Sequence, residues 1–210
     1  MVPRLPAVRR RRQLLDVALE VFAERGFYGV SMSELAEAAG ITKPVLYQHF
    51  GSKRDLYLEL LEDVGARLLE EITKATVSAE GPRQQVEAGF AAYFRFVSEQ
   101  PASFRLMFGG TGRSAKPDVS GRRAGADVTE GDRDFAAAIR RVEDAIAEAI
   151  AVLIDADIDD DHRRLLAHGL VGLAEGASRQ WVRTGRGGDA DVLARRLAEL
   201  AWAGLRGIHR

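Results

Sequence analysis

The chain has 210 residues, with 46% hydrophobic and 29% charged side chains and a formal net charge of −1 at pH 7. These proportions are typical of globular proteins and exclude a disordered, collagen-like or low-complexity chain. Cysteine is absent, which excludes disulfides, thiolate metal sites and a cysteine nucleophile. No apolar run reaches the roughly 18–20 residues that cross a bilayer, and no apolar segment of a signal peptide follows the N-terminal arginines. We therefore predict a cytoplasmic protein that does not enter a membrane.

The small net charge conceals an uneven distribution. Residues 1–55 hold nine Lys and Arg against six Asp and Glu, a balance of +3 that leaves −4 for the rest of the chain. A basic section before an acidic body is typical of a protein that binds a polyanion at one end. A solvated charged surface explains the same numbers, so charge alone leaves both interpretations open.

Helical periodicity dominates the first quarter of the chain. The expected helices cover residues 9–25, 33–40 and 43–50. Leu15, Leu19 and Phe22 recur at helical spacing in the first of them, and glycine stands at or just beyond the end of each. Ser31 or Ser33 is the expected N-cap of the second helix, and Thr42 that of the third. The pattern predicts short helices joined by tight turns.

The remaining chain is also predicted to be helical. The expected helices cover residues 53–79, 83–99, 101–108, 132–154, 159–184 and 189–207. The first of these carries one apolar stripe, made of Leu56, Leu60, Val64, Leu68 and Ile72, and Gly81-Pro82 is expected to break the chain after it. Residues 109–131 have no periodicity and are rich in Gly, Ser, Asp and Arg, which predicts a mobile loop. The fold class is therefore predicted to be all-α.

The second and third short helices, joined at Gly40, have the outline of a helix-turn-helix, in which the second helix enters the major groove of DNA. The residues themselves are more specific than this outline. The segment GITKPVLYQHFGSKRDL, within a match over about residues 9–62, resembles the DNA-binding segment of the tetracycline-repressor (TetR) family of transcriptional regulators. This resemblance implies a helix-turn-helix DNA-binding domain.

Candidate DNA contacts follow from this resemblance and from side-chain chemistry. They are Ser31, Ser33, Thr42, Lys43, Tyr47, Gln48, His49 and Lys53. Lys43 and Gln48 are expected to reach base edges, because Lys donates to guanine and Gln pairs with adenine. The other residues are expected to bind the DNA backbone. Three alternatives stay open: Thr42 faces a base, Tyr47 packs in the core, and His49 only closes its helix. Phe50 is expected in the core, and Arg9 to Arg12 either contact phosphates or form a solvated tail.

The family resemblance also implies a larger C-terminal domain that binds a small ligand and pairs two copies. The expected division is a basic flexible arm at 1–8, the DNA-binding domain at 9–54, and the ligand-binding and dimerisation domain at 55–210. Aromatic residues concentrate in two adjacent predicted helices, which favours an apolar effector. The candidate pocket residues are Phe90, Tyr93, Phe94, Phe104, Arg105, Met107, Phe108 and His168. For the aromatic residues, an ordinary packed core explains the same pattern.

The last two long helices are expected to form the dimer. Gly169, Gly172 and Gly176 lie at near-helical spacing, where small residues allow another helix to approach closely. A two-fold dimer predicts a palindromic operator. The expected function is a ligand-responsive regulator, most simply a repressor that its effector releases from DNA.

Two other classes of protein are alternatives. An enzyme on a helical bundle is disfavoured because no Glu-x-x-His metal pair, phosphate-binding loop or nucleophile with an evident base is present. The four histidines, His49, His162, His168 and His209, have no metal-ligand spacing, so we expect neither a metal nor another cofactor. An architectural DNA-binding protein without an effector is the second alternative.

Overall fold

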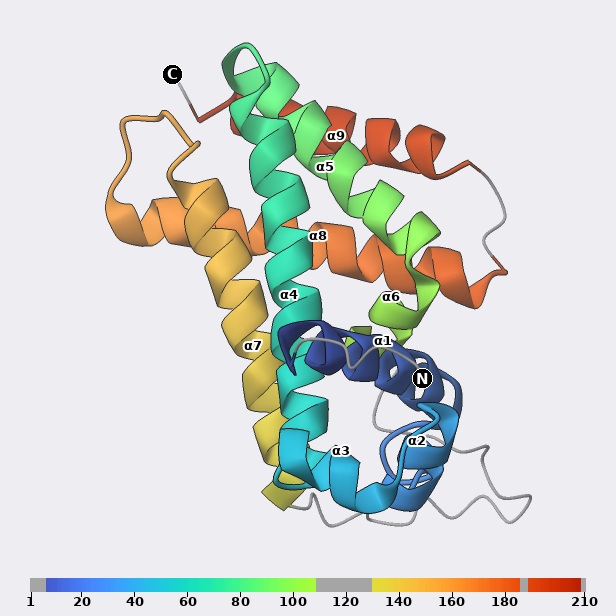
Figure 1. Cartoon of the computed structure of the whole chain (residues 1–210). Coiled ribbons are helices and arrows are strands. Elements are labelled where there is room, and N and C mark those ends of the chain that lie inside the picture. The colour runs from blue at the N-terminus through green and yellow to red at the C-terminus, as the bar shows by residue number, and fades with distance from the viewer. Residues whose placement is uncertain (1–6, 109–129, 186–188, 209–210) are drawn as a thin grey trace, which may run out of the picture. The chain divides into compact units, whose positions relative to one another are not determined.

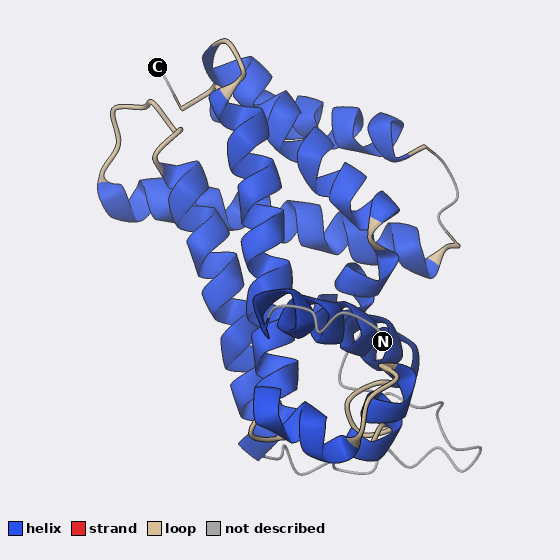
Figure 2. Ribbon diagram, viewed as in Figure 1, coloured by secondary structure: helices blue, strands red, loops and turns tan. Residues whose placement is uncertain are grey.

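The computed structural model describes residues 7–108, 130–185 and 189–208, and within these ranges it contains helices and turns but no strand (Figures 1 and 2). The helices are α1 (Ala7–Arg25), α2 (Met32–Ala38), α3 (Lys43–His49), α4 (Lys53–Val77), α5 (Gly81–Glu99), α6 (Pro101–Phe108), α7 (Glu130–Ala151), α8 (Asp160–Arg183) and α9 (Ala190–Leu205). The all-α prediction is confirmed. Residues 109–129 of the loop predicted at 109–131 lie outside the described residues. The last two, residues 130 and 131, belong to α7.

Most helix boundaries fall close to their predicted positions, because local signals set them. Gly26 and Gly40 adopt φ values of 70° and 64°, a left-handed conformation that ends a helix at little cost for glycine. The long helix ends at Val77, before the break expected at Gly81-Pro82, and α5 begins at Gly81, two residues earlier than expected, with Pro82 in its first turn. Proline is tolerated there because its missing N–H would have had no partner within the helix.

The structure divides into two compact units, which are described separately. Unit 1 comprises residues 1–64 and 102–139, and unit 2 comprises residues 65–101 and 140–210. Unit 1 thus contains α1 to α3, the first half of α4, α6 and the beginning of α7. Unit 2 contains the rest of α4 and α7 together with α5, α8 and α9.

The core of unit 1 is built around α4. Its side chains at Leu56, Leu60 and Val64 are 0% exposed, as expected for the predicted apolar stripe. An aromatic cluster adjoins them, in which the ring of Phe135 from α7 lies 4.7 Å from that of Phe27 and 4.6 Å from that of Tyr57. The start of α7 is therefore part of the same core as the first three helices.

Unit 2 is a helical bundle in which α5 packs mainly against α9 and also contacts α8. Small side chains allow close helix packing: a Cβ added at Gly65 of α4 would lie 2.3 Å from Cγ2 of Val142 on α7. Ala147, Ala151 and Ala167 form a further apolar cluster. Among the described helices, none is both long and apolar enough to span a membrane.

Candidate nucleic-acid interface

The supporting helix of the candidate interface, α2, begins with a complete capping box. The Ser31 hydroxyl accepts from the Glu34 N–H at 3.3 Å, and the Glu34 carboxylate accepts from the Ser31 N–H at 2.8 Å. Arg25 donates to Glu34 at 2.5 Å, and this bond, with those from Ser31, lowers the pKa of Glu34 to about 2. Ser31, and not Ser33, is therefore the N-cap.

The turn between α2 and α3 is a Schellman motif. The Gly40 N–H donates to the Glu37 carbonyl and the Ile41 N–H donates to the Ala36 carbonyl, both at 2.9 Å. Gly40 supplies the left-handed residue that this motif requires. The angle between the two short helices is thus set by backbone hydrogen bonds.

The outer face of α3 carries both candidate base-contacting residues, Lys43 and Gln48. Thr42, Lys43, Tyr47 and Gln48 are exposed, whereas Leu46 faces the core. The Lys43 ammonium lies 6.0 Å from the centroid of the Tyr47 ring, so both side chains belong to one surface. Thr42 has the extended backbone of an N-cap but its hydroxyl makes no capping bond, which corrects the expectation that its side chain caps the helix. Its hydroxyl is therefore available to another partner.

Lys53 occupies a different environment from these exposed residues. Its ammonium donates to the carbonyls of Phe27 at 2.9 Å and Val30 at 2.7 Å, and lies 4.3 Å from the centroid of the Phe27 ring. Burial lowers the pKa of Lys53, while the nearby Glu34 opposes this shift. Two of the three donors of Lys53 thus fasten the start of α4 to the connection between α1 and α2.

The first helix contributes arginines to unit 1 rather than extending them as an arm. Arg9 to Arg12 all lie within α1, which begins at Ala7, and residues 1–6 are outside the described part of the chain. Arg11 forms an ion pair with Glu59 at 2.5 Å, and Arg12 pairs with Asp63. Partners separated by about 50 positions leave no local signal in the sequence, so the sequence does not predict these contacts.

The candidate pocket residues are distributed over both units. Phe90, Tyr93 and Phe94 are buried in unit 2, whereas Phe104 and Met107 are buried in unit 1 and Phe108 is half-buried there. Arg105 and His168 are exposed, and His168 lies 3.9 Å from the Asp144 carboxylate. The predicted set is therefore divided between the two units.

Tyr93 has the most distinctive polar environment among these residues. Its hydroxyl hydrogen-bonds to that of Ser178 at 3.1 Å, and the Ser178 side chain is 0% exposed. Burial raises the pKa of Tyr93, and burial together with Glu175 raises the pKa of Glu143 on α7. Ser178 and Glu143 were not among the predicted residues.

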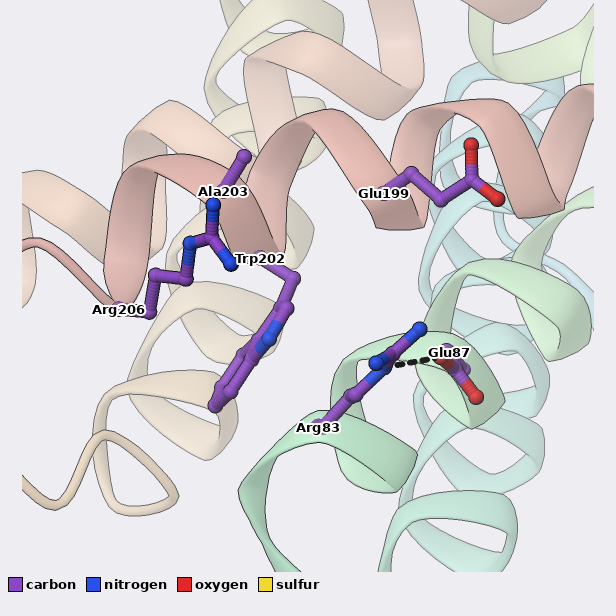
Figure 3. Close-up of a pocket in the computed structure, with 6 residues that line it drawn as sticks. All are labelled: Arg83, Glu87, Glu199, Trp202, Ala203 and Arg206. Carbon is purple, nitrogen blue, oxygen red and sulfur yellow. Dashed lines mark hydrogen bonds and ion pairs between the residues drawn. The ribbon is translucent and has the colours of Figure 1, made fainter.

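A pocket of about 200 Å³ lies elsewhere in unit 2, between α5 and α9. Figure 3 shows Arg83 extended toward Glu87, with Trp202 between Arg83 and Arg206. The remaining lining residues are Glu199 and Ala203. None of the predicted pocket residues lines it, and its two arginines are balanced by two glutamates.

Comparisons with known proteins identify the family. A model described as "Bacterial regulatory proteins, tetR family" matches residues 14–60, and one described as "Tetracyclin repressor-like, C-terminal domain" matches residues 71–209. This chain belongs to the TetR family. The match at residues 14–60 contains the helix-turn-helix described above, so the chain is a DNA-binding transcriptional regulator and the family resemblance seen in the sequence is confirmed.

Individual TetR-family proteins match over most of the chain. The HTH-type transcriptional activator FasR of Mycolicibacterium smegmatis is 34% identical over 204 residues, which cover 96% of this chain and 85% of FasR. The regulator BetI of Rhizobium meliloti is 30% identical over 155 residues, or 70% of this chain and 74% of BetI. A TetR-like regulator from Rhodococcus sp. RHA1 has a TM-score of 0.73 and 29% identity, covering 97% of this chain and 100% of its own. FadR of Bacillus subtilis, solved in complex with stearoyl-CoA, shares the fold with a TM-score of 0.71 at 16% identity, covering 90% of this chain and 96% of FadR.

Proposed function

We propose that this TetR-family protein binds a palindromic operator as a homodimer and leaves it when a small apolar effector binds. DNA binding is assigned to residues 9–54, and effector binding and pairing to residues 55–210. The observation that carries the proposal is the outward face of α3, where Lys43, Tyr47 and Gln48 are exposed. The supporting helix α2 begins with a complete capping box.

The proposed DNA contacts fall into two classes. Lys43 and Gln48 read base edges in the major groove, because their donors and acceptors are exposed on α3. Tyr47, Thr42 and Ser33 bind phosphates and so fix the position of the helix on the duplex. Ser31 reaches a phosphate only by exchanging the bond that its hydroxyl donates to Glu34 at 2.7 Å. Lys53 keeps one donor for a phosphate besides its two carbonyl bonds, and half-buried His49 closes α3 beside the backbone.

Pairing is proposed to use α8 and α9. An exposed stripe runs along α8 through Leu165, Gly169, Gly172 and Gly176, and Leu200 is exposed on α9. A Cβ added at any of these three glycines would meet nothing within 4 Å, so this face has room for the close approach of a second helix. Pairing through the same face in both copies gives two-fold symmetry, and the operator is then palindromic.

The effector is proposed to be apolar. Buried aromatic side chains in α5 and α6 favour such a ligand, and FadR shows that this fold accommodates an acyl thioester. Release from DNA requires that the effector bind the DNA-incompetent arrangement more tightly than the competent one. The continuous helix α4, which follows α3 directly, is the proposed lever.

The decisive experiment is selection of bound duplexes by the purified protein from random or genomic DNA at near-physiological salt, followed by sequencing. Enrichment of a palindrome is the expected result. Salt-sensitive binding without an enriched motif would contradict the proposal and indicate an architectural DNA-binding protein.

A second experiment tests release from DNA, by adding stearoyl-CoA or free stearate to the complex of the protein with its selected operator. A ligand that binds tightly without changing operator affinity would contradict the proposed coupling.

A regulator of this kind represses or activates according to where its operator lies. FasR is named an activator, whereas KstR2 of Mycobacterium tuberculosis, 32% identical over 93 residues, is named a repressor. Release from an operator that overlaps the promoter raises transcription, as expected for the repressor proposed here. A reporter whose expression falls when the regulator is deleted would establish activation instead.

A further inference from the structure

We propose that Arg11 of α1 is a positioning residue for DNA binding: it holds the C-terminal end of α3 against α4 and makes no contact with DNA itself. This proposal rests on the DNA-binding role of α3. It assigns a function to a basic residue that charge alone would place among the phosphate contacts.

The contacts of Arg11 connect three helices of unit 1. Its Nε and Nη2 donate to the two carboxylate oxygens of Glu59 on α4, at 2.8 Å and 2.5 Å. Its Nη1 donates to the carbonyl of His49, the last residue of α3. The guanidinium carbon lies 4.4 Å from the centroid of the Phe50 ring, directly after α3. The planar guanidinium thus uses both its edges and its face within the protein.

The end of α3 needs such a partner. The last carbonyls of a helix have no partner within it, and they form the negative end of its dipole. With seven residues, α3 is too short to be stable alone, so its direction depends on tertiary contacts. Leu46 is the one buried residue within α3, and the contact at His49 therefore adds a second point of attachment.

The geometry of Arg11 also explains why its charge is poorly placed for a phosphate. A fork that binds a carboxylate in the bidentate manner would have to give up those bonds to reach DNA. The adjacent pair formed by Arg12 and Asp63 connects α1 to α4 in a similar way, and no contact between Arg12 and α3 is observed in the described residues. This second pair provides a matched control.

The test compares Glu59→Gln with Asp63→Asn in the full-length protein bound to its selected operator. Removing an acidic residue normally strengthens binding to DNA, because it reduces repulsion of the phosphates. Glu59→Gln is nevertheless expected to weaken operator binding by about tenfold, since it loosens Arg11 and with it α3. Asp63→Asn is expected to bind as tightly as the unmodified protein or more tightly.

Salt dependence separates positioning from direct contact. Arg11→Gln and Arg11→Lys are expected to lower affinity with the slope of log K against log salt unchanged, since no phosphate contact is lost. A phosphate-binding arginine would lower that slope by about one. Binding to random duplex should change less than binding to the operator. Arg11→Lys keeps the charge but not the bidentate fork, so it should recover only part of the affinity.

The outcomes are distinguishable from failure of the proposed function. If the unmodified protein enriches no operator, the proposed function fails. If the unmodified protein does enrich an operator, two results overturn only the role of Arg11. One is that Glu59→Gln binds the operator as tightly as the unmodified protein, and the other is that Arg11→Gln lowers the salt slope by about one. Should Glu59→Gln fail to fold, by circular dichroism, Arg11→Lys provides the same test.

Discussion

Side chains of the same charge have different tasks in unit 1, and exposure separates them. Lys43 extends from the outer face of α3, whereas Lys53 and Arg11 donate to backbone carbonyls within the unit. A charge that already has protein partners must exchange them to bind DNA, while an exposed charge exchanges only water. Exposure therefore ranks the candidate contacts better than charge does.

Gln48→Ala should relax sequence preference at one base position of each half-site. Loss of a bidentate contact costs about 1–3 kcal/mol of discrimination. Quantitative binding to operators with single substitutions measures this change. Tyr47→Phe, which removes only a proposed phosphate contact, should weaken binding to all these sequences alike. Unchanged preference in Gln48→Ala would exclude Gln48 from base recognition.

Glu34 should make the stability of unit 1 depend on pH. Its pKa is lowered to about 2 by bonds from Arg25 and Ser31, so its contribution to folding is present above the ordinary value of 4.5 and is lost as pH falls toward 2. Glu34→Gln should therefore be less stable than the unmodified protein at pH 7, and the difference should shrink at pH 3. Urea denaturation at both pH values measures it. Glu37→Gln, on the same helix but outside the capping box, is the control, and a pH-independent difference would contradict the assignment.

At the scale of elements, the close approach of α4 and α7 depends on one glycine. Gly65 and Val142 face each other within unit 2, and a Cβ at position 65 would also lie 2.7 Å from Cγ1 and 3.0 Å from Cβ of Val142. A β-branched valine has little freedom to move away from such a clash. Glycine is therefore kept inside a helix despite its low helix propensity.

Gly65→Ala should destabilise the protein by about 1–3 kcal/mol, although alanine normally favours a helix over glycine. The free energy of unfolding in urea measures this effect. The double variant Gly65→Ala, Val142→Ala should lose less stability than the sum of the two single changes, because the smaller residue removes the clash. An increase in stability for Gly65→Ala alone would show that the two helices move apart freely.

At the scale of the whole molecule, α4 and α7 each contribute residues to both units. The start of α7 shares the aromatic core of unit 1 through Phe135, and Tyr28 donates to Asp132 on the same helix at 2.8 Å. Helix α7, like α4, therefore connects the two units through its own backbone.

Pairing of two molecules should depend on the exposed glycines of α8. Gly172→Arg places a long charged side chain on this face without any clash inside the monomer, since nothing lies within 4 Å of an added Cβ. It should yield a monomer by analytical ultracentrifugation. Operator affinity should fall by roughly 10²–10⁴, the gain that linking two half-sites gives. Ala66→Arg, at an exposed position of α4, is the control, and a dimeric Gly172→Arg would exclude this face from the interface.

The sequence was sufficient to locate the helices and the helix-turn-helix, because helical periodicity, N-caps and left-handed glycines act over a few neighbouring residues. It also singled out Lys43, Tyr47 and Gln48, which the structure shows exposed on α3, whereas Leu46 is buried. The roles of these residues on DNA stay predictions.

Only the tertiary structure decided which charges are used within the protein and which remain free. Arg11 meets Glu59, and Tyr28 meets Asp132, across sequence separations of 48 and 104 residues. No local pattern encodes such pairs, because they depend on how distant helices pack. For the same reason the sequence does not predict the contact between Gly65 and Val142. Glycine is needed at position 65 because of the neighbouring helix α7, and not because of the helix α4 that contains it.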